Sequence, residues 1–314
     1  MIDIIIPAFN AHETIERTLF SIAYQKQISL ANVYIVNDGS DEDYSKEIKF
    51  FSKFLKIKEL KMKKNSGPGC ARQYGIDHSE SEYIIFIDSD DVFYDPYVVS
   101  NLYNTIISEN YDLVISNFYE KIDNDFLLRK RESTFLHGKI YKRSFLEKNN
   151  IKFNDSRNEE DNGFNQLLLL CNPKTICIDL ISIIWCDYDK SITRKDDYAY
   201  TKQSLGIKGY TFNIEWAIEE GIKRNCDEEK ISKLAYSALI ELYYKYLQNQ
   251  NDEVIKCTKN IYNLTNKHPL SEQDKKILYE EVFDCSLNDY SRMYLLNPCV
   301  SFEEFINLVK EQVI

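Results

Sequence analysis

The chain has 314 residues, 44% hydrophobic and 28% charged, which is typical of a globular protein with one large or two modest domains. Its net charge of −11 makes nucleic acid an unlikely main partner, because phosphate binding needs a basic face. No apolar run approaches the roughly 20 residues of a membrane-spanning helix, and the first residues lack a basic signal-peptide start. We expect a cytoplasmic protein without a transmembrane segment, and peripheral contact with the inner face of the membrane stays open.

Residues 1–120 alternate short apolar runs with stretches of helical periodicity. Strands are predicted at 2–6, 33–36, 57–62, 83–87 and 111–116, and helices at 13–27, 48–55, around 70–74 and from Pro96 onward. Strands that are apolar on both faces are typical of parallel sheets covered by helices on both sides. The sequence therefore predicts an α/β fold with a mainly parallel, Rossmann-like sheet.

The last third of the chain has only helical signals. Apolar residues recur at helical spacing near 213–223, 231–242, 252–263, 272–284 and 302–312. We expect two domains, residues 1–197 around the sheet and an all-helical domain at 198–314.

Three polar loops follow predicted strands, at residues 7–10, 37–40 and 88–91. Ligands of open α/β sheets bind beyond the carboxyl ends of the strands. Because parallel strands present those ends at one edge, the three loops are expected to lie together.

The third loop concentrates negative charge, with Asp88, Asp90 and Asp91 directly after IIFI. A solvated turn needs fewer acids, and a calcium loop counted from Asp88 fails at its sixth and twelfth positions, Phe93 and Val99. The eight cysteines form no CxxC pair and the four histidines no HxH or HxxxH, so a zinc site is not expected. Oxygen ligands instead favour Mn²⁺ or Mg²⁺ held by Asp90 and Asp88 with substrate phosphates, and Asp91 ranks last.

The same loop admits a second interpretation. A strand followed by DSDDV resembles the nucleophile motif of haloacid-dehalogenase-like phosphatases, in which Asp88 would attack phosphorus and Asp90 would act as acid and base. This resemblance covers about five residues and leaves the first two loops unexplained.

Four segments taken together resemble the family-2 glycosyltransferases of the GT-A fold. They are IIIPAFN at 4–10, VNDGS at 36–40, NSGPGCARQYG at 65–75 and FIDSDD at 86–91, in this order and at this spacing. The resemblance extends over roughly residues 1–195. It implies a metal-dependent, inverting enzyme that uses a nucleoside diphosphate sugar.

In that family the first two loops hold the nucleoside. The resemblance implies that Pro7, Ala8 and Asn10 line this pocket. It also implies that Asp38 accepts a hydrogen bond from the N–H of the base, which suits uracil and favours a UDP-sugar. Asn37 departs from the pattern, since an acid is frequent at this position.

The next two segments supply the rest of the donor site. Gly67 is implied to let the backbone approach the ligand, and Arg72 to close the pocket. Asp88, Ser89 and Asp90 correspond to the DxD element of the family, whose second acid usually reaches the metal.

The candidates for the catalytic base lie in the second half of the chain. Glu160 and Asp161 precede an apolar helical run, where acids in the first turn are also favoured by the helix dipole. In register with the Glu-Asp motif of the family, Asp161 corresponds to the base and Glu160 to its neighbour.

Several residues are implied near the acceptor or the diphosphate. His137 lies in LHGKIYKRSFL, a segment that resembles the family's approach to the acceptor, although a lone histidine is more often structural. Ser191, Thr193 and Arg194 lie in DYDKSITR, which resembles a segment near the diphosphate.

The acceptor is expected to be a carbohydrate, a lipid-linked saccharide or a polymer such as a surface polysaccharide. A non-catalytic sugar-nucleotide-binding protein is a further alternative. The helical third has no recognisable motif and is expected to build the acceptor site, a membrane-facing surface or a homo-oligomer interface. Its tyrosines 243, 244 and 246 are expected to pack in a core or interface rather than to stack on sugars.

Overall fold

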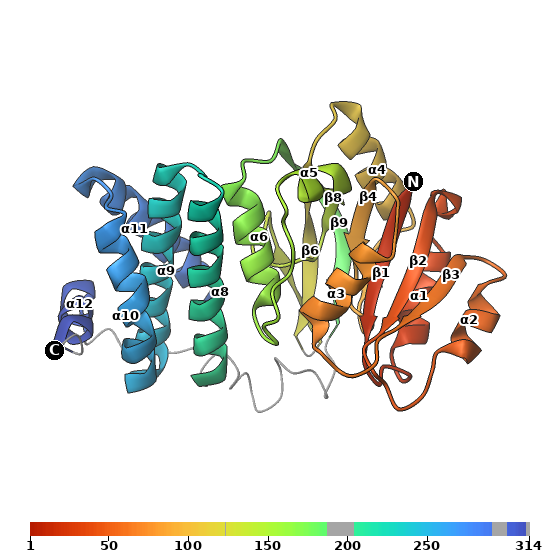
Figure 1. Ribbon diagram of the computed structural model, residues 1–314, viewed down its shortest axis with the longest axis horizontal. Helices are drawn as coiled ribbons and strands as arrows, with labels where there is room; N and C mark the ends of the chain where they lie inside the picture. Colours follow the sequence, from red (N-terminus) through yellow and green to blue (C-terminus); the bar gives the residue numbers. More distant parts are fainter. Residues whose placement is uncertain (123, 187–203, 291–299, 312–314) are drawn as a thin grey trace. The chain divides into compact units, whose positions relative to one another are not determined.

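The computed structural model describes residues 1–122, 124–186, 204–290 and 300–311 (Figure 1). The chain divides into two compact units, Met1–Asp189 and Lys190–Ile314. The predicted domain boundary at residue 197 lies outside the described residues. None of the helices in the described ranges is long and apolar enough to cross a membrane.

The first unit is built on one sheet, in which the described residues supply nine strands in the order β3-β2-β1-β4-β8-β6-β9-β5, with β7 paired to β6. The strands are β1 (Ile2–Ala8), β2 (Ala31–Asn37), β3 (Lys56–Lys61), β4 (Tyr83–Phe86), β5 (Val92–Phe93), β6 (Leu113–Ile122), β7 (Asp125–Arg129), β8 (Lys139–Lys142) and β9 (Thr175–Trp185). The helices are α1 (Ile15–Ala23), the 3₁₀ turn η1 (Ile28–Leu30), α2 (Ser45–Phe51), α3 (Pro68–Asp77), α4 (Val98–Ser108), α5 (Arg143–Lys148) and α6 (Glu160–Leu170).

Helices cover both faces of the sheet, as the apolar strands predicted. Even-numbered residues of β1, such as Ile4, share a buried core with Leu19 of α1, Phe51 of α2 and Leu102 of α4. Successive strand residues point to opposite faces, so Ile5 packs on the other side, against α3. Both faces of β1 are therefore shielded from water, and its carboxyl end is free to carry polar groups.

The predicted parallel arrangement holds for β3, β2, β1 and β4, which pair with one another in parallel. Beyond β4 the sheet is mixed, because β8 lies antiparallel between β4 and β6. The carboxyl ends of β1, β2 and β4 consequently lie at one edge, where the three polar loops begin.

Pro7 does not end β1, contrary to the sequence-based expectation. Pro7 pairs in register with Val36 and the strand continues to Ala8. The carbonyl of Ile5 accepts from the N–H of Ile87, and Pro7, two residues on, faces the same side. Pairing with β4 ends at Phe86, so the missing N–H of Pro7 removes no hydrogen bond from the ladder.

The second unit is helical in its described part, as predicted. Its helices are α8 (Ser204–Lys223), α9 (Glu228–Asn249), α10 (Asp252–Lys267), α11 (Glu272–Tyr290) and α12 (Phe302–Glu311). Tyr243, Tyr244 and Tyr246 are 5%, 2% and 8% exposed, and the rings of Tyr243 and Tyr246 pack on Phe305. These tyrosines belong to the core of this unit, which agrees with the packing interpretation.

Gly75 of α3 allows the packing of this helix on the sheet of the first unit to be tested. A Cβ atom at Gly75 would lie 2.6 Å from Cγ2 of Ile5 and 3.1 Å from Cγ2 of Val36. Alanine gains up to about 1 kcal/mol of helix propensity over glycine, whereas overpacking a core costs about 1–3 kcal/mol. We expect Gly75→Ala to lower the free energy of unfolding by about 1–2 kcal/mol, measured by denaturant titration.

The matched control is Asn104→Ala, on the exposed face of α4, which tests helix propensity without overpacking. It should be neutral or slightly stabilising. Stabilisation by Gly75→Ala would show that α3 does not pack closely on β1 and β2.

Candidate functional site

The first two loops are joined by side-chain hydrogen bonds. Asn10 donates through its backbone N–H to Oγ of Ser40 (3.0 Å) and through Nδ2 to Oδ2 of Asp41 (3.0 Å). The backbone N–H of Asp41 donates back to Oδ1 of Asn10 (3.0 Å). Asn10 has φ of 50°, a left-handed conformation that asparagine tolerates well. The loops after β1 and β2 thus form one wall at the sheet edge.

Asp38 connects this wall to the third predicted segment. Its two carboxylate oxygens accept the backbone N–H groups of Ser66 and Gly67, each at 2.8 Å. Asp38 is only 3% exposed, and Gly67 has φ of +96°, which favours glycine. A base N–H would have to use a remaining lone pair of Asp38, so base recognition by Asp38 stays a prediction.

The presence of asparagine at position 37, where an acid is frequent in the family pattern, has a physical explanation. Its Nδ2 donates to Oε1 of Glu59 on the neighbouring strand β3 (2.7 Å), and its Oδ1 accepts the backbone N–H of Ser40 (2.8 Å). An aspartate in this place would face the carboxylate of Glu59 without a proton to share. Glu59 therefore requires a donor at position 37.

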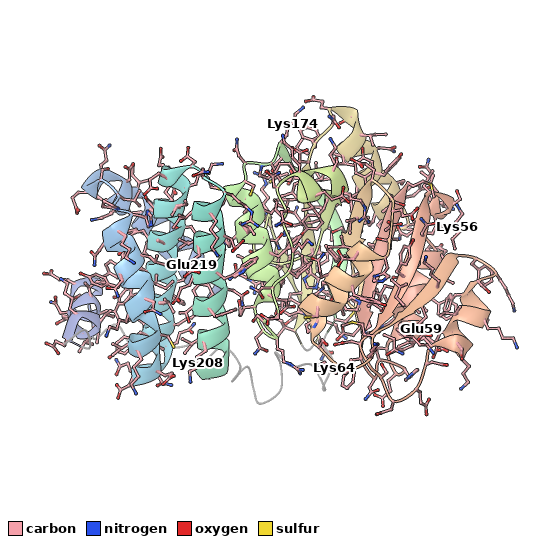
Figure 2. The ribbon with its side chains drawn as sticks, in the orientation of Figure 1. Lys56, Glu59, Lys64, Lys174, Lys208 and Glu219 are labelled. Carbon is pink, nitrogen blue, oxygen red and sulfur yellow. The ribbon has the colours of Figure 1, made fainter. Side chains whose placement is uncertain are left out.

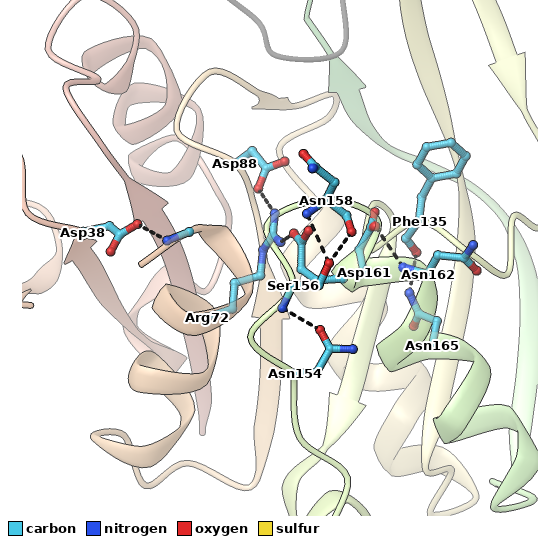
Figure 3. A network of polar contacts seen from close by, with 12 residues as sticks. Asp38, Arg72, Asp88, Phe135, Asn154, Ser156, Asn158, Asp161, Asn162 and Asn165 are labelled. Atoms are coloured by element: carbon cyan, nitrogen blue, oxygen red, sulfur yellow. Dashed lines mark hydrogen bonds and ion pairs between the residues drawn. The ribbon is translucent and has the colours of Figure 1, made fainter. Parts of the chain in front are cut away.

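Arg72 lies at the centre of the site and points from α3 toward the acidic loop (Figure 3). Its Nη2 donates to Oδ1 of Asp88 (2.6 Å) and its Nη1 to Oε1 of Glu160 (2.7 Å). Burial lowers the pKa of Arg72, but the charges of Asp88, Glu160 and Asp161 outweigh it and the pKa is raised. A buried guanidinium thus holds the loop after β4 to the start of α6.

The three acids after β4 have different surroundings. Burial raises the pKa of Asp88, but Arg72 and then His137 outweigh burial, so the pKa is lowered. For Asp90, burial together with Asp91 and Asp88 outweighs the opposing effect of His137 and raises the pKa to about 7. Charge repulsion in the DSDD loop therefore falls chiefly on Asp90.

Asp91 and His137 form a buried pair. Nε2 of His137 lies 2.8 Å from Oδ2 of Asp91, and the backbone N–H of Cys186 donates to Oδ1 of Asp91 (2.8 Å). The imidazole stacks between Phe118 and Trp185, with ring centroids at 5.1 and 5.3 Å. Burial lowers the pKa of His137, but Asp91 outweighs it and the pKa is raised. His137 thus positions the acidic loop, a contact that the sequence pattern did not predict.

The donor set fits a hard divalent cation. Asp88, Asp91 and His137 each offer a ligand atom, and these atoms lie within 4.8 Å of one another. Carboxylate oxygens are the ligands that Mg²⁺ and Mn²⁺ prefer, and the raised pKa of Asp90 is what a nearby cation would reverse. This group includes Asp91 and omits Asp90, whereas the sequence favoured Asp90 and Asp88 as ligands. Both oxygens of Asp91 already accept hydrogen bonds, so the ranking of Asp90 first stays a prediction.

Helix α6 places two acids at its first turn, as predicted. Glu159, at the N-cap, has φ of 60°, and the buried Glu160 turns to Arg72. Asp161 follows, and its Oδ1 accepts the N–H of Asn162 (2.8 Å). Burial is the main cause of the raised pKa of Asp161, which Arg72 partly offsets. The carboxylate of Asp161 thus has a raised pKa and lies within the electrostatic reach of Arg72 and Asp88.

Other predicted residues have less defined places. Pro7 and Ala8 are buried and Ser89 is half-buried. Ser191, Thr193 and Arg194 lie outside the described residues.

Arg157 was not singled out from the sequence. Its Nη2 donates to the carbonyl of Asn65 (3.1 Å), which ties the segment before α6 to the Gly67 loop. The signal that could have found it is weak, since an exposed arginine beside acids is common.

A comparison with known protein families identifies the family to which this chain belongs. The family model described as Glycosyl transferase family 2 matches residues 3–162, just over half of the 314-residue chain. The chain belongs to this family. The match spans the segments after β1, β2 and β4 and reaches the acids at the start of α6, so the resemblance predicted from the sequence is confirmed.

One curated relative is the poly(ribitol-phosphate) β-N-acetylglucosaminyltransferase TarP of Staphylococcus aureus, 29% identical over 201 residues, with 56% of this chain and 59% of TarP covered. The chain spans 59% of the length of TarP, 17% of an uncharacterized glycosyltransferase of Rickettsia bellii and 29% of the glycosyltransferase GlyA of Streptococcus pneumoniae. It thus covers less than two thirds of each of these relatives.

Two solved structures share the fold. Staphylococcus aureus TarS 1–349 in complex with UDP-GlcNAc gives a TM-score of 0.67 at 15% identity, covering 93% of this chain and 91% of that chain. The mannosyltransferase PcManGT from Pyrobaculum calidifontis, in complex with GDP-Man and Mn²⁺, gives 0.59 at 13% identity, covering 99% and 86%. These similarities confirm the predicted GT-A fold with its helical C-terminal region.

The Asn37–Glu59 contact can be tested by a double-mutant cycle. We expect Asn37→Asp to lower the free energy of unfolding at neutral pH by about 1–3 kcal/mol, because it removes a buried donor and adds a like charge. Combining it with Glu59→Gln restores a donor and should recover most of the loss, measured by denaturant titration. If the two changes are additive, the contact does not explain the asparagine.

Proposed function

We propose that the chain is a metal-dependent, inverting glycosyltransferase. It moves a sugar from a nucleoside diphosphate sugar, UDP-linked in our proposal, to an acceptor hydroxyl. The observation that carries the proposal is the placing of Asp161 beside the Arg72–Asp88 pair, at the edge of the sheet where the first two loops are joined. One edge thus brings together a candidate base and a candidate donor site.

The nature of the donor rests on two kinds of support. The loops after β1 and β2 are braced by Asn10 and Asp38, which suits a site for a rigid nucleoside. TarS is solved with UDP-GlcNAc and PcManGT with GDP-Man and Mn²⁺, so relatives of this fold accept more than one base. UDP is favoured here because a carboxylate such as Asp38 can accept the N–H of uracil.

The chemical step assigned to Asp161 is proton transfer. A carboxylate oxygen of Asp161 takes the proton of the acceptor hydroxyl while that oxygen forms its bond to the anomeric carbon. The bond from that carbon to the diphosphate oxygen breaks on the opposite side, and the diphosphate leaves with the electron pair. The raised pKa of Asp161 makes it a stronger base while it remains ionised.

The other residues of the site prepare this step. Arg72 fixes Glu160, and hence the first turn of α6, against the acidic loop. Asp90 and Asp88, next to the hydrogen-bonded Asp91 and His137, would hold Mn²⁺ or Mg²⁺. Such a cation supplies charge neutralisation at the departing diphosphate, worth several kcal/mol.

The acceptor is proposed to be a carbohydrate, lipid-linked or polymer hydroxyl in the synthesis of a surface polysaccharide or glycoconjugate. TarP, by its name, acts on poly(ribitol-phosphate), which makes that polymer a first acceptor to try. Residues 190–194 and His137 stay candidates for contacts near the acceptor or diphosphate. The phosphatase interpretation is dropped, because the family match includes all three loops and not the acidic one alone.

The base is tested by Asp161→Asn, with transfer followed as release of the nucleoside diphosphate from the donor. The amide keeps the shape of the side chain and cannot take the proton. We expect turnover to fall about 10²- to 10⁴-fold with donor affinity unchanged.

Asp155→Asn is the matched control, an exposed acid just before α6, and should retain turnover. Near-normal turnover of Asp161→Asn would overturn the base assignment. A wild-type chain that binds donors and shows no transfer or hydrolysis with any acceptor would instead support the non-catalytic alternative.

The cation is tested by thermal stabilisation with a panel of UDP-, GDP- and TDP-sugars, each with Mn²⁺, Mg²⁺ or chelator. Bound donor at about 100 times its Kd stabilises a fold by about 2.7 kcal/mol, which raises Tm measurably. We expect a UDP-sugar to raise Tm only with the cation, and Asp90→Ala to abolish that increase. An equal increase in chelator would contradict the metal proposal, and a GDP- or TDP-sugar preference would contradict the choice of uracil.

A further inference from the structure

An exposed aromatic and basic surface lies on α1, on α2 and on the turn that follows α2. We call it the aromatic–lysine face. Its members are Phe20, Phe50, Phe54, Lys46, Lys49 and Lys53.

The aromatic part is contiguous and largely accessible to water. Phe20, Phe50 and Phe54 are 54%, 45% and 59% exposed. The ring centroids of Phe20 and Phe50 lie 5.9 Å apart and those of Phe50 and Phe54 6.0 Å apart. Phe51, only 1% exposed, packs beneath Phe20 and Phe50 and anchors them to the core. Three neighbouring phenylalanines are thus held outward by the fold.

The charge around these rings is positive, although the whole chain carries −11. Residues 45–55, which form α2 and the turn after it, contain three lysines and one acid, a local balance of +2. That acid, Glu47, is 7% exposed and faces Nδ1 of His12 (3.3 Å), so it does not offset the lysines at the surface. Nζ of Lys53 lies 5.4 Å from the ring of Phe50, whereas Lys56, labelled in Figure 2, begins the edge strand β3 and its Nζ donates to the carbonyl of Ser29 (2.9 Å).

The charged residues on and around α1 do not cancel this positive charge. Residues 13–27 contain two acids, Glu13 and Glu16, and two basic residues, Arg17 and Lys26. Their balance is zero, so the positive character of the face comes from α2 and the residues after it.

The combination of exposed aromatic rings and lysines indicates which kind of partner could bind this face. A second copy of the chain meeting this face about a two-fold axis would set lysines against lysines, which is unfavourable. Aromatic rings bordered by lysines instead match a surface with an apolar interior and anionic head groups.

We propose that the aromatic–lysine face docks on an anionic lipid bilayer. The three phenylalanines enter the boundary between head groups and acyl chains, and the lysines pair with lipid phosphates. Lysines near such a surface are attracted over about one Debye length, so binding depends on salt. This inference does not rest on sugar transfer, because it concerns where the chain lies and can be measured without turnover.

The experiment is co-sedimentation of the full chain with vesicles of phosphatidylcholine, with or without roughly 30% phosphatidylglycerol. We expect binding to the anionic vesicles, weaker binding at high salt, and little binding to the neutral vesicles. Phe50→Ser with Phe54→Ser, and Lys46→Glu with Lys53→Glu, should each weaken binding by about tenfold or more. Unchanged Tm and circular dichroism identify variants that remain folded.

Two control pairs match these changes elsewhere. Lys148→Glu with Lys152→Glu alters total charge equally at exposed lysines, and Phe126→Ser with Phe212→Ser removes two rings that are 53% and 49% exposed. Both pairs should bind as the wild type does. Three results would overturn the proposal: no binding to anionic vesicles, equal loss in the control pairs, or a wild-type dimer in sedimentation that the Phe50 and Phe54 changes dissociate.

Discussion

The site depends on one buried cation, the guanidinium of Arg72. It contacts Asp88, at the end of β4, and Glu160, in the first turn of α6, two residues 72 positions apart in sequence whose segments would otherwise repel each other. Removing one partner of a buried ion pair leaves an uncompensated charge and typically costs 3–5 kcal/mol. The position of Asp161, one residue beyond Glu160, is therefore set by an interaction made on α3. Local helix geometry alone would not place it.

A second pair supports the same loop from the other side. His137 and the N–H of Cys186 take both oxygens of Asp91, while Arg72 takes one oxygen of Asp88. The acidic loop is thus held at its first and last acids, and Asp90 between them has no such side-chain contact among the described residues. A loop fixed at both ends loses little conformational entropy on binding a ligand.

The sequence was most informative where structure is local. Apolar runs and helical spacing located β1, β2 and β4 and the helices of the second unit, because burial of one strand or one helix face is visible within about ten residues. The insertion of β8 between β4 and β6 and the His137–Asp91 pair were not predictable in this way, since they join segments 24 to 59 positions apart. Asn37 looked like a departure from a motif until Glu59 of β3 supplied its partner.

The pKa directions indicate that the acidic loop can accept more positive charge than the described residues supply. Burial raises the pKa of Asp90, Asp91, Glu160 and Asp161, and only Asp88, with Arg72 in contact and His137 nearby, has a lowered pKa. Among the described residues, these five acids share the guanidinium of Arg72 and the imidazole of His137 as partners, and protonation also relieves their repulsion. A diphosphate is itself negative and would add to that repulsion. If it binds beside Asp90, a divalent cation would neutralise part of the negative charge of both groups and would lower the raised pKa of Asp90.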